Sequence, residues 1–423
     1  MDNEASRSGS LLLMLVAVAC GGPDGGRFSP EVADSAGIRI ITISPPGSGD
    51  ADVAHADAEW GRDLPIRRID DARILQDRIA LLDGGTGELW VFEEDAGRML
   101  TFGGIRNGHP AAVRPTAFAS FEGGVAVWDR GLLQFTVFDR RGSFVRVIPQ
   151  PVRGDVPSFS LRQDPEDLSM RFRVARDELW LQLEDSELEL RDPAMTEVQE
   201  IPRRGAILRV ARDGSSVDTV FSYRAATYRV VPEGLSHRGG ILLPEARWAV
   251  HDTLFAWGRS DTTEIRLYHT DGSLRSILRW SPVRNPIGNQ EKRDYARAWL
   301  RETPNMYPSH IPAAERQAAI DAAADRLATP DVAPEFSALL IHGACLWVAS
   351  YDLESSSDGR SRTWSYHRLD DGAGDTVVFD SIPMRIMDIG ATRAVGRLIS
   401  DDDGVHYIRS YPLPARARET CRG

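Results

Sequence analysis

Short segments in which apolar and polar residues alternate recur along most of the chain, separated by turns rich in Asp and Gly. Asp83 and Phe92 end two neighbouring segments and recur as Asp129 and Phe138, so the repeat is roughly 46 residues long. Each unit predicts a strand that ends at an aspartate, a second strand that ends in Phe, a tight Asp-Gly turn and a third strand. Further copies follow Leu179, Leu254 and Leu346 at the starts of similar segments.

A repeated antiparallel meander of roughly 40 to 50 residues is typical of a β-propeller, in which each small sheet packs against its neighbours. The pattern therefore predicts an all-β fold, a six-bladed propeller of four-stranded antiparallel blades over residues 34–413. The expected blades cover residues 62–105, 112–150, 166–224, 228–282, 335–382 and 384–413.

The last blade contains only three evident strand segments, so a strand from elsewhere must complete it. The segment Ile38 to Thr42 follows the turn at Asp34 to Gly37 and has no obvious local partner. We expect Ile38 to Thr42 to pair with the last blade and close the ring.

Residues 289–327 interrupt the strand pattern with apolar residues at spacings of three and four, which predicts two helices separated by Pro304 and Pro308. Because specificity in a propeller resides in connections that depart from the repeat, this helical insert is the candidate ligand-binding element. The candidate residues are Tyr295, Arg297, Trp299 and Arg301, with the arginines available to an anionic group. A structural brace over a blade edge is an equally consistent role.

The N-terminus carries an apolar run from Leu11 to Ala19 that ends at Cys20. Nine helical residues reach only about 14 Å, too short to cross a bilayer, so the run is typical of a signal peptide. Ala17-Val18-Ala19-Cys20 resembles the bacterial lipoprotein signal, which implies removal of residues 1–19, diacylation of Cys20 (a palmitate-type modification) and a membrane anchor. Residues 20–33 would be a flexible tether, and 414–423 a C-terminal tail.

Composition narrows the classes of function. Hydrophobic residues make up 42% and charged residues 26% of the 423 residues, as in a folded protein, and the net charge of −12 argues against a nucleic-acid partner. Lys292 is the single lysine, which excludes a phosphate-binding Gly-Lys-Ser/Thr loop.

If Cys20 carries the lipid, only Cys345 and Cys421 remain as cysteines. We expect Cys345 to be a buried thiol and Cys421 to lie in a frayed tail, without a bridge between them.

Two hypotheses for function remain open. The nine histidines show no zinc-binding spacing, and Asp401 to Asp403 lack the rest of a calcium loop, so no metal ligand set and no cofactor is identified in the sequence. The first hypothesis is a binding or scaffolding module for an envelope protein, a peptide or a glycan. The alternative is a metal-dependent hydrolase or lyase in which a divalent cation binds in the central channel. Catalytic residues are unknown on either hypothesis.

Trp90, Trp128, Trp180, Trp257 and Trp347 recur in the predicted strands at what we interpret as equivalent positions. Core packing explains this recurrence better than a carbohydrate-binding platform does.

The lipid-attachment cysteine, the segments Asp34 to Ile40 and Asp83 to Leu89, and Val137-Phe138-Asp139 resemble a family of bacterial six-bladed propeller lipoproteins, within the wider NHL-type and TolB-like propeller group. The resemblance implies the architecture and an extracytoplasmic, lipid-anchored location in the outer membrane or cell envelope. It implies no activity, because propellers of this group share a fold and not a function. We expect a monomer.

Overall fold

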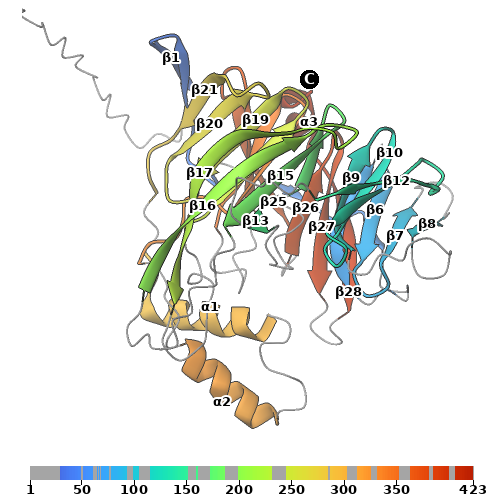
Figure 1. The fold of residues 1–423 in the computed structure, drawn as a ribbon. Coiled ribbons are helices and arrows are strands. Elements are labelled where there is room, and N and C mark those ends of the chain that lie inside the picture. Colours follow the sequence, from blue (N-terminus) through green and yellow to red (C-terminus); the bar gives the residue numbers. More distant parts are fainter. Residues whose placement is uncertain are drawn as a thin grey trace, which may run out of the picture.

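The computed structural model describes residues 29–48, 51–60, 64, 66, 68–75, 78–92, 99–103, 115–150, 159–160, 172–185, 199–230, 244–283, 286–302, 312–324, 331–351, 363–380, 384–399 and 405–422. Within these ranges the strands form six sheets, arranged as the blades of a six-bladed β-propeller (Figure 1). The predicted fold class is confirmed.

The first three blades follow the chain in order. Blade one contains β5 (Ile69–Leu75), β6 (Arg78–Asp83), β7 (Glu88–Phe92) and β8 (Met99–Gly103). Blade two contains β9 (Pro115–Phe121), β10 (Gly124–Asp129), β11 (Gln134–Phe138) and β12 (Phe144–Pro149). Blade three contains β14 (Phe172–Ala175), β15 (Glu178–Asp185), β16 (Gln199–Val210) and β17 (Val217–Val230), with the short β13 (Phe159–Ser160) also paired to β15.

The last three blades each take in strands from the N-terminal segment. Blade four contains β18 (Ala246–His251), β19 (Leu254–Arg259), β20 (Glu264–His269) and β21 (Leu274–Arg279), with β2 (Ile38–Thr42) and β1 (Glu31–Ser35) outside them. Blade five contains β22 (Ala338–His342), β23 (Cys345–Ala349), β24 (Thr363–Arg368) and β25 (Gly374–Phe379), then β3 (Ala51–Ala54). Blade six contains β26 (Met384–Ile389), β27 (Arg393–Ile399), β28 (His406–Pro412) and β4 (Ala58–Trp60).

The first strand of each blade faces the centre of the ring. Neighbouring inner strands contact one another in the order β5, β9, β14, β18, β22 and β26, and β26 contacts β5 again. The buried apolar residues form clusters that each lie between two neighbouring blades. The core is therefore a set of layers between blades, as the alternation of apolar and polar residues in each strand requires.

Tryptophans fill these layers, but not all at the same position. Trp128, Trp180 and Trp347 are buried on the second strand of their blades, and Trp257 is partly buried on β19. Trp90 is also buried, but it lies on β7, the third strand of blade one. The predicted core role is confirmed, whereas the predicted equivalence of Trp90 with the others is wrong, because it pairs across from Leu81 on the second strand.

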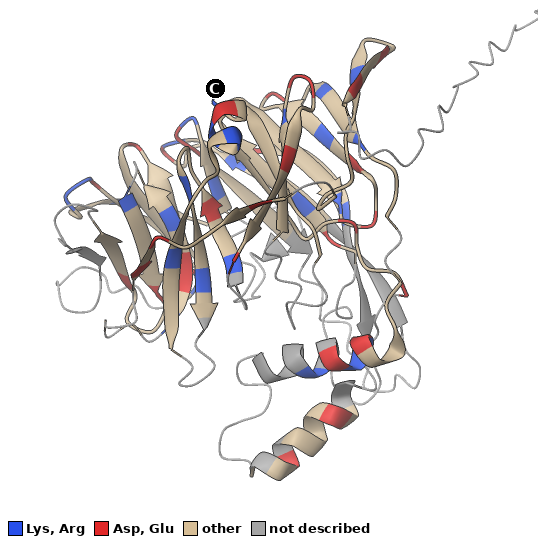
Figure 2. Cartoon of the chain, turned by 180° about the vertical axis from the view of Figure 1, so that it is seen from behind, with Lys and Arg blue, Asp and Glu red and all other residues tan. Residues whose placement is uncertain are grey.

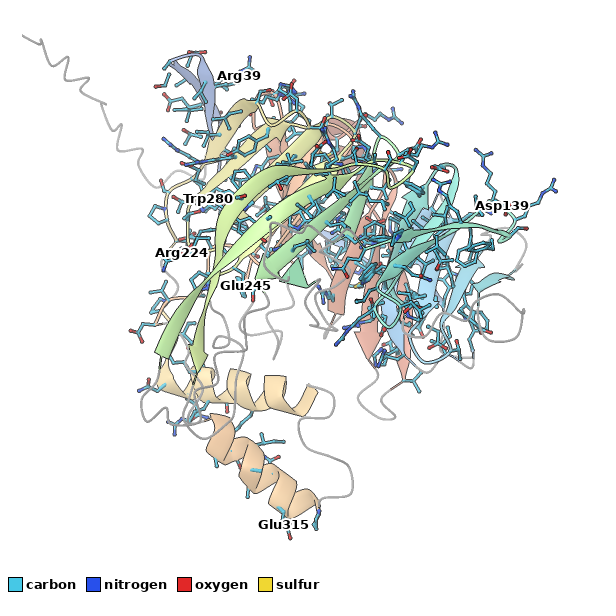
Figure 3. All side chains as sticks on the ribbon, in the orientation of Figure 1. Arg39, Asp139, Arg224, Glu245, Trp280 and Glu315 are labelled. Atoms are coloured by element: carbon cyan, nitrogen blue, oxygen red, sulfur yellow. A yellow bond between two sulfur atoms is a disulfide. The ribbon has the colours of Figure 1, made fainter. Side chains whose placement is uncertain are left out.

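The aspartate turns of the repeat form as the sequence predicts. Asp139 follows β11, and its carboxylate accepts hydrogen bonds from the backbone N–H groups of Arg141 and Ser143, each at 2.8 Å (Figure 3). Gly142 in this turn has φ of 80°, a conformation that glycine adopts without steric cost. Asp213, Asp271 and Asp371 accept the equivalent backbone hydrogen bonds after the third strands of blades three, four and five.

The N-terminal segment does not close the ring as expected. Ile38–Thr42 forms a local hairpin with Glu31–Ser35 and pairs in parallel with β21 of blade four, where Arg39 projects at the outer edge (Figure 3). The strand that completes blade six is Ala58–Trp60, antiparallel to β28. The physical reason is connectivity: the strand that closes the ring must directly precede the first blade, and β4 is the strand before β5.

The helical insert is confirmed. Helix α1 (Asn289–Glu302) and helix α2 (Ala313–Ala324) lie beyond one end of the ring, between blades four and five (Figure 1). The Ile287 amide donates to the Asp331 carbonyl at 2.9 Å, so the two ends of the insert lie side by side. Lys292 pairs with Asp331 at 2.6 Å beside this junction.

The C-terminus is tied to the ring, contrary to the expectation for its cysteine. Helix α3 (Ala415–Thr420) packs Ala417 and Cys421 into the cluster between blades five and six. Cys421 forms a disulfide with Cys345 on β23, and their Cα atoms are 5.0 Å apart. The expected free thiols are therefore wrong, because docking of α3 brings residues 76 positions apart in the sequence within bonding distance.

Candidate functional site

A pocket of about 420 Å³ lies where the six inner strands converge, in the central channel. Each blade contributes residues that directly precede the turn from its first to its second strand. Among them are Arg73 on β5, Ser120 on β9, Arg173 on β14, His251 on β18, His342 on β22 and Asp388 on β26. The pocket therefore occupies the end of the channel at which the inner strands finish.

Charged side chains inside the channel connect neighbouring blades. Asp71 on β5 accepts a hydrogen bond from the Phe118 amide of β9 at 3.1 Å, and Asp388 accepts one from the Ile74 amide at 3.0 Å. Arg73 pairs with Asp71 at 3.2 Å and donates to the Met387 carbonyl at 3.3 Å. These contacts satisfy inner-strand amides and carbonyls that no further strand can pair.

Burial shifts the pKa values of two of these groups. Arg173 is buried, and desolvation together with the positive charge of Arg73 lowers its pKa to about 9. Burial also raises the pKa of the Asp71 carboxyl, an effect that Arg73 opposes. At neutral pH the guanidinium of Arg173 is therefore positively charged, although it is buried away from solvent.

Two histidines stand at the mouth of the pocket. The rings of His251 and His342 have centroids 5.7 Å apart, and each residue is the last of its inner strand. Their imidazoles can donate or accept hydrogen bonds towards a ligand that enters from this side.

Polar contacts and ion pairs link blades two, three and four at this end of the ring. Glu122 donates its backbone N–H to Asp177 at 3.0 Å and pairs through its carboxylate with Arg212 at 2.6 Å. Arg176 pairs with Asp252 at 3.5 Å. Glu122, Arg176 and Asp252 adopt φ of 53°, 53° and 48°, in turns that favour Gly or Asn. The charged residues at these positions therefore impose some backbone strain.

The insert residues selected from the sequence lie elsewhere. Arg297 on α1 pairs with Asp321 on α2 at 2.7 Å and with Asp294 at 3.2 Å, which braces the two helices. The side chains of Tyr295, Trp299 and Arg301 lie outside the described residues, so a role for these residues in ligand binding stays a prediction.

The insert and the pocket lie at opposite ends of the inner strands. The insert leads into β22 at Ala338, whereas the pocket is lined by residues 340–342 and its mouth lies at His342, the last residue of that strand. The sequence analysis missed the channel residues. The available signal was the presence of charged residues, Asp70 to Arg73 and Arg173, inside otherwise apolar inner strands.

The described ranges contain neither a metal-ligand cluster of three or more residues nor a membrane-spanning helix. There, no group of three or more His, Cys, Asp or Glu side chains is arranged to hold a metal ion. No helix in the same part of the chain is long and apolar enough to cross a membrane. Cys20 and the Asp401 to Asp403 segment lie outside the described residues.

Several solved structures are similar to this chain at low sequence identity. No family model and no curated protein matches the sequence. A Bacteroides fragilis protein classed as exported is 10% identical, with 89% of this chain and 100% of that chain covered and a TM-score of 0.45. Virginiamycin B lyase from Staphylococcus aureus is 10% identical over 84% of each chain, with a TM-score of 0.37.

A third similar structure is the calcium-binding protein regucalcin from Agrobacterium tumefaciens, which is 9% identical and has a TM-score of 0.39. This match covers 86% of this chain and 96% of that chain.

Proposed function

We propose that this protein is an extracytoplasmic, lipid-anchored propeller that binds a ligand in its central channel. The observation that carries the binding function is the 420 Å³ pocket, which is lined by at least one polar residue from each of the six inner strands. Pockets of this size with a few convergent polar groups are the usual form of small-molecule sites.

Two features support export and anchoring. The sequence from Leu11 to Cys20 has the length and spacing of a lipoprotein signal. The disulfide between Cys345 and Cys421 is typical of proteins that fold in an oxidising compartment.

The alternative of a metal-dependent hydrolase or lyase requires three or more ligands that meet in the channel. In the described channel, the carboxylates of Asp71 and Asp388 instead accept hydrogen bonds from backbone amides of neighbouring inner strands. The geometry therefore favours a binding module. Small ligands fit this pocket better than an envelope protein, a peptide or a long glycan, which would have to contact the rim or the insert.

Replacement of the lipidation residue tests the anchor. We expect wild-type protein in the membrane fraction after cell lysis and Cys20→Ala in the soluble or unprocessed fraction, because a diacyl group supplies the membrane affinity. Fractionation followed by mass measurement of the mature N-terminus decides the point. Soluble wild-type protein in the cytoplasm would contradict the proposal.

A further inference from the structure

The mouth of the channel is built from different residue types in different blades. In four blades the last residue of the inner strand is apolar and buried: Leu75, Phe121, Ala175 and Ile389. In the neighbouring blades four and five the same position holds His251, which is exposed, and His342, which is partly exposed. Two imidazoles therefore meet at the solvent-facing edge of the pocket, where the other blades place hydrocarbon side chains.

Packing gives little reason for this pair, because exposed rings bury little apolar surface. Metal binding gives a better one, since imidazole is the commonest protein ligand for zinc and related ions. Each ring has two nitrogens, so one nitrogen binds an ion while the other keeps a contact with the protein, as is usual for histidine ligands.

The distance between the two rings fits a shared ion. A ring nitrogen holds Zn²⁺ at about 2.1 Å, which places the ion about 3.2 Å from the ring centroid, so tetrahedral coordination by two imidazoles separates their centroids by about 5.2 Å and a linear arrangement by about 6.4 Å. The centroids of His251 and His342 are 5.7 Å apart, between these limits, and the rings are inclined by 37°. Rotation of the exposed His251 side chain is enough to direct both nitrogens at one point.

The charges near the mouth are compatible with a cation. Asp252 directly follows His251 and is exposed, and Asp388 lines the pocket from β26. The guanidinium-bearing residues Arg73 and Arg173 lie two positions before the ends of their strands, which places them about 7 Å deeper along the channel. A cation therefore fits at the mouth and not in the interior.

We infer that His251 and His342 form a two-histidine site for a divalent transition-metal ion of the Zn²⁺ type, which bridges blades four and five at the mouth of the channel. No third His, Cys, Asp or Glu of the described residues joins them, so water completes the coordination. The inference goes beyond the proposed ligand binding and does not depend on it.

Isothermal titration with Zn²⁺ at a pH of about 7.5, where most imidazoles are neutral, tests the inference. The protein is the tag-free, disulfide-intact mature chain from residue 20 with Cys20→Ala, so that no thiol competes for the ion. We expect one saturable site per chain and binding of Ca²⁺ that is at least about tenfold weaker, because Ca²⁺ prefers oxygen ligands. Saturating Zn²⁺ should also raise the temperature of unfolding, since it binds the folded protein.

Variants then locate the site. His251→Gln and His342→Gln should each weaken Zn²⁺ binding by about tenfold or more, because the second imidazole binds as an intramolecular ligand. The double variant should be little weaker than either single variant, since one remaining histidine no longer chelates. His269→Gln is the matched control, because His269 is an exposed histidine of blade four that does not line the pocket, and its affinity should stay within about twofold of wild type.

Circular dichroism without metal verifies that each variant is folded. If His342→Gln does not fold, His251→Gln at its exposed position still decides the question. Absence of a saturable Zn²⁺ site would overturn the inference, as would Zn²⁺ binding that His251→Gln leaves unchanged, which would mark the ion as adventitious at other side chains. Equal binding of Ca²⁺ and Zn²⁺ would indicate carboxylate ligands and also overturn it. Each of these results leaves the proposed binding of a ligand in the channel intact, because that function needs no metal ion.

Discussion

At the residue scale, buried ionisable groups are the features of this propeller that respond to solution conditions. His367 on β24 is buried, and desolvation lowers its pKa to about 4, an effect that a hydrogen bond to the backbone of Gly372 opposes. The folded protein therefore holds this imidazole neutral where the unfolded chain would protonate it. The consequence is a loss of stability in acid that can be assigned to one side chain.

Replacement of His367 by a residue that does not titrate should remove that part of the acid sensitivity. Because the folded pKa is lowered, the stability is fully present above about 6.5 and is lost as the pH falls from 6.5 towards 4. Over this window the free energy of unfolding of wild type should fall by roughly 3 kcal/mol more than that of His367→Gln. Urea unfolding at several pH values measures the difference, and His269→Gln at an exposed position is the control. Parallel pH curves for wild type and His367→Gln would contradict this assignment.

At the scale of elements, the N-terminal segment reinforces three successive blades before the chain enters blade one. Strand β2 extends blade four and β3 extends blade five, both in parallel pairing, whereas β4 is the antiparallel fourth strand of blade six. Arg409 on β28 pairs with Glu59 on β4 at 3.0 Å across this closure. Ring closure therefore depends on the shortest of these strands.

Two truncated chains separate closure from reinforcement. A chain that begins at residue 56 lacks β1, β2 and β3 but keeps β4, and a chain that begins at residue 62 lacks β4 as well. We expect the first to stay monomeric and to unfold cooperatively, with a loss of about 2–5 kcal/mol from removal of buried residues such as Ile41. The second should open the edge of β28 and aggregate, because an unpaired edge strand templates pairing with other chains. Size-exclusion chromatography and thermal unfolding distinguish the two, and indistinguishable behaviour of both chains would show that β4 does not close the ring.

At the scale of the whole molecule, the helical insert and the channel pocket lie at different ends of the ring. The helical insert lies beyond one end of the inner strands, with Glu315 at its far end (Figure 3), and the channel pocket is lined at the other end. Acidic and basic residues are interspersed over the blades (Figure 2), consistent with a net charge of −12 that is not gathered into one basic surface.

Excision of the insert tests this separation. Because Ile287 and Asp331 are hydrogen bonded at the base of the insert, a short Gly-Ser linker can replace residues 289–327 without strain on the ring. The affinity for a ligand of the channel should stay within about twofold of wild type, since the described residues of the insert do not line the pocket. A loss of tenfold or more in the folded, excised protein would show instead that the insert covers the ligand.

The sequence by itself determined the repeat, the six blades, the aspartate turns and the position of the helical insert. These features are local, because alternation of side chains, turn residues and helical spacing act over a few neighbouring residues. Tertiary structure alone decided which strand closes the ring, the bridge between Cys345 and Cys421, and the meeting of Arg73, Arg173 and Asp388 in one channel. The residues in each of these contacts are distant in the sequence, and they meet only because six blades are arranged around a common axis. A single sequence contains no signal for that arrangement, whereas the pattern within each blade contains the signal for its strands.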